Sequence, residues 1–201
     1  MNIPWWQWTK ECPKHLVNIA ERDKVALAVH EEDFVPITWQ QAKFGIATGN
    51  TDFARRPKVL RAYRDSFVTI NQIYATNLDY LKGELGWEDL RPSAATPFGS
   101  LDDYQITLNG YPYGWDDGIY HVVVWCKFPL PDGEGTLHVN KDSRDRIDRW
   151  VRVQWPTQAS EDIMWWRNPV KFKSVPELEH FHVLLRCPDP YIIDELESRV
   201  L

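Results

Sequence analysis

Apolar side chains recur at spacings of three and four over residues 57–85, which is the strongest periodic signal in the chain. This spacing places side chains on one face of a helix. We therefore predict one long amphipathic helix that begins at Pro57, ends at Gly86 and carries basic residues on its outer face. The apolar positions are Leu60, Tyr63, Phe67, Ile70, Tyr74, Leu78, Leu81 and Leu85.

Four other segments have helical signals. Residues 14–29 follow Pro13, which fits the first turn of a helix. Residues 38–47 open with Thr38-x-x-Gln41, the spacing of a capping box, and are followed by Gly49. We also predict a helix over residues 143–154 and a terminal helix over residues 190–201.

Strand-forming residues are concentrated in the second half of the chain. We predict strands over residues 103–108, 119–128, 162–166 and 179–186, a turn over residues 129–135 and irregular structure over residues 87–101. Because helices come first and strands interspersed with helices follow, the pattern favours an α+β fold. Its N-terminal helices would pack on a small, mainly antiparallel sheet.

Length favours a single domain over residues 1–201. Within it we distinguish an aromatic and helical extension (1–37), a core (38–186) and a C-terminal helix (187–201). The extension begins with Trp5, Trp6 and Trp8, which we expect to lie on the body of the fold, since three exposed indoles would form a sticky patch.

Composition favours a cytoplasmic protein with no membrane segment. The three cysteines form no CxxC pair, no signal-peptide pattern opens the chain, and no apolar run approaches the roughly 20 residues of a membrane span. The net charge is −6, from 23 basic and 29 acidic residues, which is unfavourable for gripping nucleic acid. A local basic face remains compatible with that balance.

The segment NGYPYGWDDGIYHVVVWCK (residues 109–127) combines a loop with a strand. Asp116 and Asp117 follow Trp115 in the loop, close to Tyr111 and Tyr113. Carboxylates beside aromatic faces suit an organic cation such as a guanidinium. The alternative is a purely structural turn in which an aspartate caps its own backbone.

Three histidines lie on the two central predicted strands. His180 and His182 alternate along one strand and therefore share a face, while His121 begins the other. The pair resembles half of a metal site and part of a histidine triad, but position 184 is Leu and no Cys or acidic partner has ligand spacing. We expect no metal and no cofactor. The histidines would act as acid–base or orienting groups, or would simply pack in the core.

Basic residues cluster in two places that could contact phosphates. Each cluster can equally be a solvated helix face. The first cluster comprises Arg55, Arg56, Arg61 and Arg64, and the second comprises Arg144, Arg149 and Arg152.

Several segments together resemble one known family. They are WQQAKFGIATGN, LRAYRDSFVTINQIYATNLDYLKGELGW, NGYPYGWDDGIYHVVVWCK, IMWWRNP and KSVPELEHFHVLLR, which run from about Thr38 to Arg186. They look like the fungal N-acetylglucosamine-induced-protein family, a domain of unknown function that also resembles the arginine-containing cyclodipeptide synthases of fungal secondary metabolism.

The resemblance implies an enzyme that joins arginine to a second amino acid, both taken from aminoacyl-tRNAs, and closes a diketopiperazine. Activated esters need neither ATP nor a metal, so the protein would position two substrates and move protons. Those synthases carry a DDxxE motif, which here reads Asp116-Asp117-Gly118-Ile119-Tyr120. Tyr120 stands where Glu is expected, and a phenol that titrates near pH 10 cannot replace a carboxylate.

Two further functions remain open: a non-catalytic protein that binds a cationic or sugar ligand, and a His-dependent phosphoester hydrolase. All share one predicted pocket. Its catalytic candidates are Asp116, Asp117, Tyr120, His121, Glu179 and His182. Its substrate-binding candidates are Trp115, Tyr113, Trp125, His180, Arg167 and Lys173. The arginine clusters would contact aminoacyl-tRNA.

Overall fold

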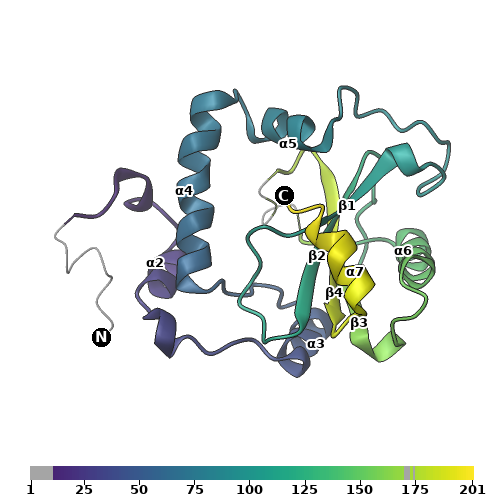
Figure 1. Cartoon of the computed structure of the whole chain (residues 1–201). Helices are drawn as coiled ribbons and strands as arrows, with labels where there is room; N and C mark the ends of the chain where they lie inside the picture. Colours follow the sequence, from purple (N-terminus) through teal and green to yellow (C-terminus); the bar gives the residue numbers. More distant parts are fainter. Residues whose placement is uncertain (1–10, 170–172, 174) are drawn as a thin grey trace.

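The computed structural model describes residues 11–169, 173 and 175–201. The predicted placement of Trp5, Trp6 and Trp8 falls outside these residues. Within them, six α-helices and short 3₁₀ turns surround one four-stranded sheet (Figure 1). The predicted α+β class is therefore confirmed.

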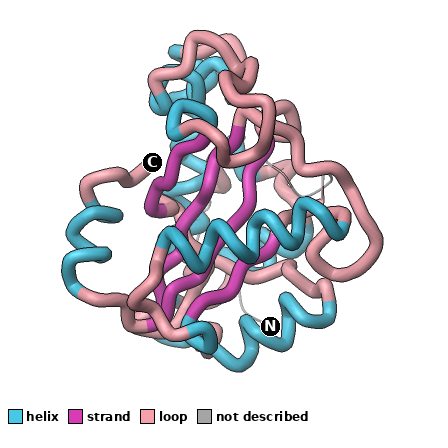
Figure 2. Tube along the Cα trace, turned by 90° about the vertical axis from the view of Figure 1, so that its right-hand side faces the viewer, coloured by secondary structure: helices cyan, strands magenta, loops and turns pink. Residues whose placement is uncertain are grey.

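The sheet has the strand order β1-β2-β4-β3, and every neighbouring pair is antiparallel. Its strands are β1 (Tyr104–Leu108), β2 (Ile119–Cys126), β3 (Ile163–Trp166) and β4 (Glu179–Arg186). Each matches a predicted segment to within two residues at either end. In Figure 2, viewed from the side of α6, the strands lie side by side with a helix across them.

One face of the sheet is apolar and fully covered. Side chains that alternate along the strands, such as Val122, Val124 and Phe181, pack against α6 (Lys141–Gln154) and α7 (Pro190–Glu197). This is the largest core cluster. It is held by non-polar burial alone along most of its area.

The opposite face carries the histidines together with tryptophans. Here α3 (Trp39–Thr48) and α5 (Asn77–Leu85) cover the two ends of the sheet through two smaller clusters. Helix α3 begins with the predicted capping box, in which Thr38 and Gln41 each accept a hydrogen bond from the other's backbone N–H. It ends at Gly49, whose left-handed conformation (φ 75°) suits glycine.

The prediction of one helix over residues 57–85 is wrong, because the segment is divided into α4 (Pro57–Ile73) and α5. Tyr74 adopts an extended conformation, and the Thr76 hydroxyl accepts a hydrogen bond from the Asp79 backbone N–H at 3.1 Å. A hydroxyl that caps a new N-terminus interrupts the helix although the apolar spacing continues. Figure 1 shows α4 beside the sheet and α5 near one end of its strands.

The prediction of one helix over residues 14–29 is also wrong. The chain forms a 3₁₀ turn (Lys14–Leu16) and then α2 (Glu21–Leu27), which packs on α4 through Leu16, Leu27 and Leu60. Leu16 is 1% exposed, so the chain turns away after it to bury this side chain against α4. Tertiary burial here overrides a continuous helix.

Candidate functional site

A pocket of about 260 Å³ lies between α4 and the histidine-bearing face of the sheet. Of the α4 residues, only Pro57 and Leu60 are buried, although the helix has a strong apolar stripe. Tyr63, Phe67 and Ile70 of that stripe line the pocket instead of closing against the sheet. An apolar helix face held away from the sheet is typical of a ligand cavity.

His180 presents an uncharged acceptor at the floor of this pocket. Its Nδ1–H donates to the Leu178 carbonyl at 2.9 Å, which fixes the tautomer and leaves a lone pair on Nε2. Nε2 has no hydrogen-bond partner among the described residues, although the side chain is buried and lines the pocket. The Trp125 ring lies against the imidazole with centroids 4.8 Å apart and orients it.

A second polar feature is a hydrogen-bonded chain through the other two histidines. His121 Nε2 lies 3.0 Å from His182 Nδ1, and His182 Nε2 lies 3.0 Å from Asn168 Nδ2. At the far end, His121 Nδ1 lies 3.3 Å from Asn109 Nδ2. Residues from the loop before β2, from both central strands and from the segment after β3 are thereby linked.

Both amide groups in this chain turn their N–H side to an imidazole. The Asn168 oxygen accepts from the Trp166 indole N–H at 3.0 Å, and the Asn109 oxygen accepts from the Tyr111 backbone N–H at 2.9 Å. Two amide N–H groups and two neutral imidazoles place four protons in three contacts, so one contact brings two donors together and the other two are hydrogen bonds. A further proton on either ring would create a second donor–donor contact, so the geometry favours neutral imidazoles.

Electrostatics lead to the same conclusion. Burial, together with the nearby charge of Arg55, lowers the pKa of His121 to about 3. Burial likewise lowers the pKa of His180 to about 4 and places the pKa of His182 well below its usual value. All three rings are uncharged at neutral pH, so they serve as hydrogen-bond donors and acceptors.

Arg55 is another residue that lines the pocket. Its guanidinium carbon lies 4.2 Å from the Tyr63 ring centroid and 4.7 Å from that of Tyr113. Its Nε–H donates to the Tyr111 carbonyl at 2.8 Å. Tyr113 in turn stacks on His121 with centroids 5.3 Å apart, so the guanidinium is fixed to the sheet through a layer of rings.

The other charged side chains at the pocket form ion pairs with one another. Asp23 of α2 forms an ion pair with Arg64 of α4, and Arg22 forms one with Asp52. Because the two members of each pair neutralise one another, the charge of Arg55 is the one that no aspartate side chain of the lining balances. The wall therefore does not favour the positively charged guest that the sequence suggested.

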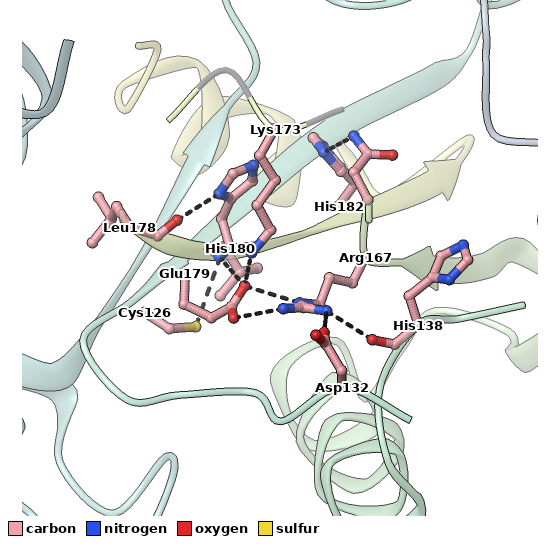
Figure 3. A network of polar contacts seen from close by, with 11 residues as sticks. Cys126, Asp132, His138, Arg167, Lys173, Leu178, Glu179, His180 and His182 are labelled. Carbon is pink, nitrogen blue, oxygen red and sulfur yellow. Dashed lines mark hydrogen bonds and ion pairs between the residues drawn. The ribbon is translucent and has the colours of Figure 1, made fainter. Parts of the chain in front are cut away.

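Another charged network lies at one end of the sheet (Figure 3). Arg167 donates two hydrogen bonds of 3.0 Å to Glu179 and one of 2.6 Å to Asp132, and Lys173 also pairs with Glu179. Burial alone would raise the pKa of the Glu179 carboxyl, but these two cations hold it below its usual value. The network joins the start of β4 to the segments after β2 and β3.

The predicted site residues divide into three groups, of which the acidic loop with Tyr120 is the third. The pocket lining includes Tyr113, Trp125, His180 and His182, and His121 lies directly behind them. Glu179, Arg167 and Lys173 belong to the charged network and are not among the described residues that line the pocket.

The acidic loop does not reach the pocket, so the expectation that Trp115, Asp116 and Asp117 line it together with the histidines is wrong. Both aspartates are exposed, and Asp116 accepts a hydrogen bond from the Asp117 backbone N–H at 3.0 Å, as in the structural alternative. Trp115 is buried in the cluster beneath α3. Tyr120 packs against the opposite face of the sheet, because consecutive strand residues alternate.

Some pocket residues outside the predicted site carried only a partial signal in the sequence. Tyr63 appeared only as a member of the helical stripe, and Arg55 only as a member of a basic cluster. Asn109 and Asn168 carried no distinguishing signal. Their role depends on contacts between segments more than ten residues apart, such as Asn109 with His121 and Asn168 with His182.

The two arginine clusters differ in how far they are engaged with the protein itself. In the first, Arg55 lies between tyrosines, Arg61 pairs with Asp65, and Arg64 pairs with Asp23. In the second, Arg149 and Arg152 are exposed on α6, on the other side of the sheet from the pocket. Neither arrangement forms a continuous basic face beside the pocket.

Membrane-spanning helices and metal-ligand clusters are both absent from the described part of the chain. No helix there is long and apolar enough to cross a membrane. No group of three or more His, Cys, Asp or Glu side chains there is arranged to hold a metal ion. Cys126 is fully buried on the apolar face, and burial raises the pKa of its thiol.

These features define an α+β protein whose small antiparallel sheet is covered on one face and faces a polar, aromatic pocket on the other. Residues 38–186 match the DUF3605 family, described as a protein of unknown function, and the chain belongs to this family.

Two fungal proteins and one solved structure are similar to the chain. An uncharacterized protein YPL067C of Saccharomyces cerevisiae is 26% identical over 185 residues, covering 85% of this chain and 90% of the relative. N-acetylglucosamine-induced protein 1 of Candida albicans is 24% identical over 192 residues, covering 81% of this chain and 73% of the relative. The crystal structure of HTC1 shares the fold, with a TM-score of 0.66 at 24% identity over 80% of this chain and 93% of that one.

Proposed function

We propose that the chain binds a small organic molecule in the pocket between α4 and the histidine face of the sheet. The observation that carries this proposal is the position of α4, whose apolar stripe faces a cavity of about 260 Å³ instead of the core. Burying such a stripe stabilises a protein, so an uncovered stripe above fixed polar groups suits a guest.

The chemistry of the walls indicates what kind of molecule fits. Aromatic rings from Tyr63, Phe67 and Trp125 offer flat surfaces, and His180 Nε2 accepts a hydrogen bond. A planar or ring-shaped guest with at least one donor group satisfies both features. A sugar is one such guest, and N-acetylglucosamine is worth testing because a relative's name refers to induction by it.

The proposal is tested by titrating the protein with a panel of sugars, amino acids and aromatic acids while Trp125 is observed. Trp125 lines the pocket, whereas Trp165 packs in the core cluster on the opposite face and serves as an internal control. A saturable change confined to Trp125 supports the proposal. Saturable binding that instead perturbs Trp165 and spares Trp125 contradicts it.

An aminoacyl-tRNA-dependent cyclodipeptide synthase is a second candidate. It is favoured by His180, because an amine that attacks an aminoacyl ester must lose a proton and an uncharged imidazole nitrogen can accept a hydrogen bond from it. It stands second because Asp116 and Asp117 lie outside the pocket lining among the described residues, and Tyr120 faces away.

Incubation with arginyl-tRNA and a second charged tRNA, followed by mass analysis, separates the two candidates. A cyclic dipeptide that disappears in the His180→Gln variant supports the synthase. Small-molecule binding without any such product leaves the binding function alone. A His182-dependent phosphoester hydrolase is not favoured, because both ring nitrogens of His182 are already engaged.

A further inference from the structure

The side chain of Arg55 is held in one orientation at the pocket by three contacts. The Arg55 guanidinium lies between the rings of Tyr63 and Tyr113, and its Nε–H is bound to the Tyr111 carbonyl. Its flat faces and its inner nitrogen are therefore occupied. The two terminal nitrogens, which form the fork of the group, have no protein hydrogen-bond partner among the described residues.

No carboxylate within the described part of the chain forms an ion pair with Arg55, whereas its neighbours Arg22 and Arg64 are each paired with an aspartate. Arg55 is half-buried, so its guanidinium is only partly shielded from water. Here tyrosine rings stabilise the cation without neutralising it. The charge remains available to whatever enters the pocket.

We propose that Arg55 is the anchor of an oxyanion subsite, so that the ligand of this pocket carries a carboxylate or a phosphate group. The inference rests on the proposed binding function and narrows its ligand class. A fork held rigid in advance loses little side-chain entropy when it binds two oxygens of one anion. His180 Nε2 then accepts a hydrogen bond from a donor elsewhere on the same molecule.

Two features of the wall favour this arrangement over a cation subsite. The aspartates at the pocket, Asp23 and Asp52, are each already paired with an arginine. The exposed acidic loop at Asp116 and Asp117 is not part of the lining among the described residues. A positively charged guest would therefore face Arg55, and each aspartate side chain of the lining is already balanced by an arginine.

The test uses three probes with one aromatic ring each: 3-phenylpropionate, its neutral amide 3-phenylpropanamide, and phenyl phosphate. Binding is measured by calorimetry on the full chain, with the Trp125 indole resonance reporting the location. We expect at least one of the two anions to bind about tenfold more tightly than the amide, the ratio typical of one charge-assisted pair. The carboxylate and the phosphate are compared directly to identify which anion the fork prefers.

The Arg55→Gln variant removes the charge and the fork while keeping a polar side chain. We expect it to bind acid and amide within about twofold of each other. The matched control is Arg149→Gln, which makes the same change at an exposed position on α6 and should keep the wild-type ratio. Circular dichroism and thermal unfolding establish that both variants fold.

The possible outcomes are distinguishable from failure of the binding function itself. Equal binding of amide and acids to the wild-type protein overturns the oxyanion subsite but keeps the pocket. Binding of none of the three, together with no response to the wider panel, overturns both. If Arg55→Gln does not fold, the acid-to-amide ratio on the wild-type protein and the Arg55→Lys variant, which keeps the charge but loses the fork, still decide the question.

Discussion

The two faces of the sheet are made by the same four strands and differ in almost every other respect. On the α6–α7 face, Val122, Val124 and Phe181 are 0% exposed and pack in the hydrophobic core. On the α4 face, the next residues along the same strands, His121, His180 and His182, are also buried but bind polar partners. Both sets of side chains are buried, but one set packs against apolar groups and the other forms hydrogen bonds.

The difference explains why the pocket described above lies on the histidine face. Apolar side chains gain free energy by closing on one another, so the α6–α7 face contracts until it is close-packed. The histidine face must satisfy directional hydrogen bonds, and its rings are fixed at distances near 3 Å by Asn168 and by each other. Helix α4 packs on α2 through its own Leu60, near its N-terminal end, while the rest of its apolar stripe lines the pocket.

Acidification should affect the histidine face most strongly. Since the folded pKa values of His121 and His180 lie near 3 and 4 and unfolded histidine titrates near 6.5, the unfolded state binds more protons below pH 6.5. Stability is therefore complete above pH 6.5 and is lost as pH falls towards 4. Each of these two rings should cost about 2 to 3 kcal/mol by pH 4.5. Urea unfolding at several pH values measures this loss, and a flat profile would contradict neutral buried imidazoles.

The apolar face should be most sensitive to lost volume. Phe181→Ala removes a fully buried ring that contacts Trp150 and Trp165, and we expect it to lower the free energy of unfolding by about 3 to 5 kcal/mol. The matched control is Val153→Ala on the outer face of α6, where the side chain is 73% exposed and the change should stay within about 0.5 kcal/mol. Comparable losses for both variants would show that this face is not close-packed.

The hydrogen-bonded chain should respond to loss of its amide. Asn168→Ala leaves the Trp166 indole N–H and His182 Nε2 without their partner, which should cost about 1 to 3 kcal/mol. Thr51→Val is the matched control, because it removes only the longer 3.4 Å contact to the same amide. We expect a smaller loss there, below about 1 kcal/mol. Equal losses in urea unfolding would mean that Asn168 does not hold the chain together.

The smallest effect should come from the acidic loop. Asp117→Asn changes an exposed carboxylate outside the pocket lining, so stability should move by less than about 0.5 kcal/mol and probe binding should stay the same. A large loss of binding in this variant would return the acidic loop to the site and would favour the synthase candidate over the simple binder.

Local sequence signals were sufficient for most individual elements. The strand over residues 179–186 and the capping box at Thr38 are correct because alternation and capping depend on neighbours a few residues away. The shared face of His180 and His182 follows from strand parity in the same way, and their ring centroids lie 5.6 Å apart. The family, too, was visible in the motifs.

Two predictions failed, one because the apolar spacing was followed past a local helix cap and one because a contact with a distant segment decided the outcome. The apolar spacing of residues 57–85 continues across the break between α4 and α5, and only the cap at Thr76 and the position of α5 on the sheet reveal it. The adjacent acids, Asp116 and Asp117, looked like a site because their chemistry suits one. Their loop instead pairs with Ile37 and leaves both side chains in solvent.

The sequence by itself determined the strands, the two-faced alternation of the sheet and the presence of three histidines on its central pair. Only the tertiary structure decided that α4 stands over those histidines, that their charges are suppressed by burial, and that Arg55 is fixed between two tyrosines. The physical reason is that a side chain's pKa and partners depend on what is packed around it, and those neighbours come from remote parts of the chain.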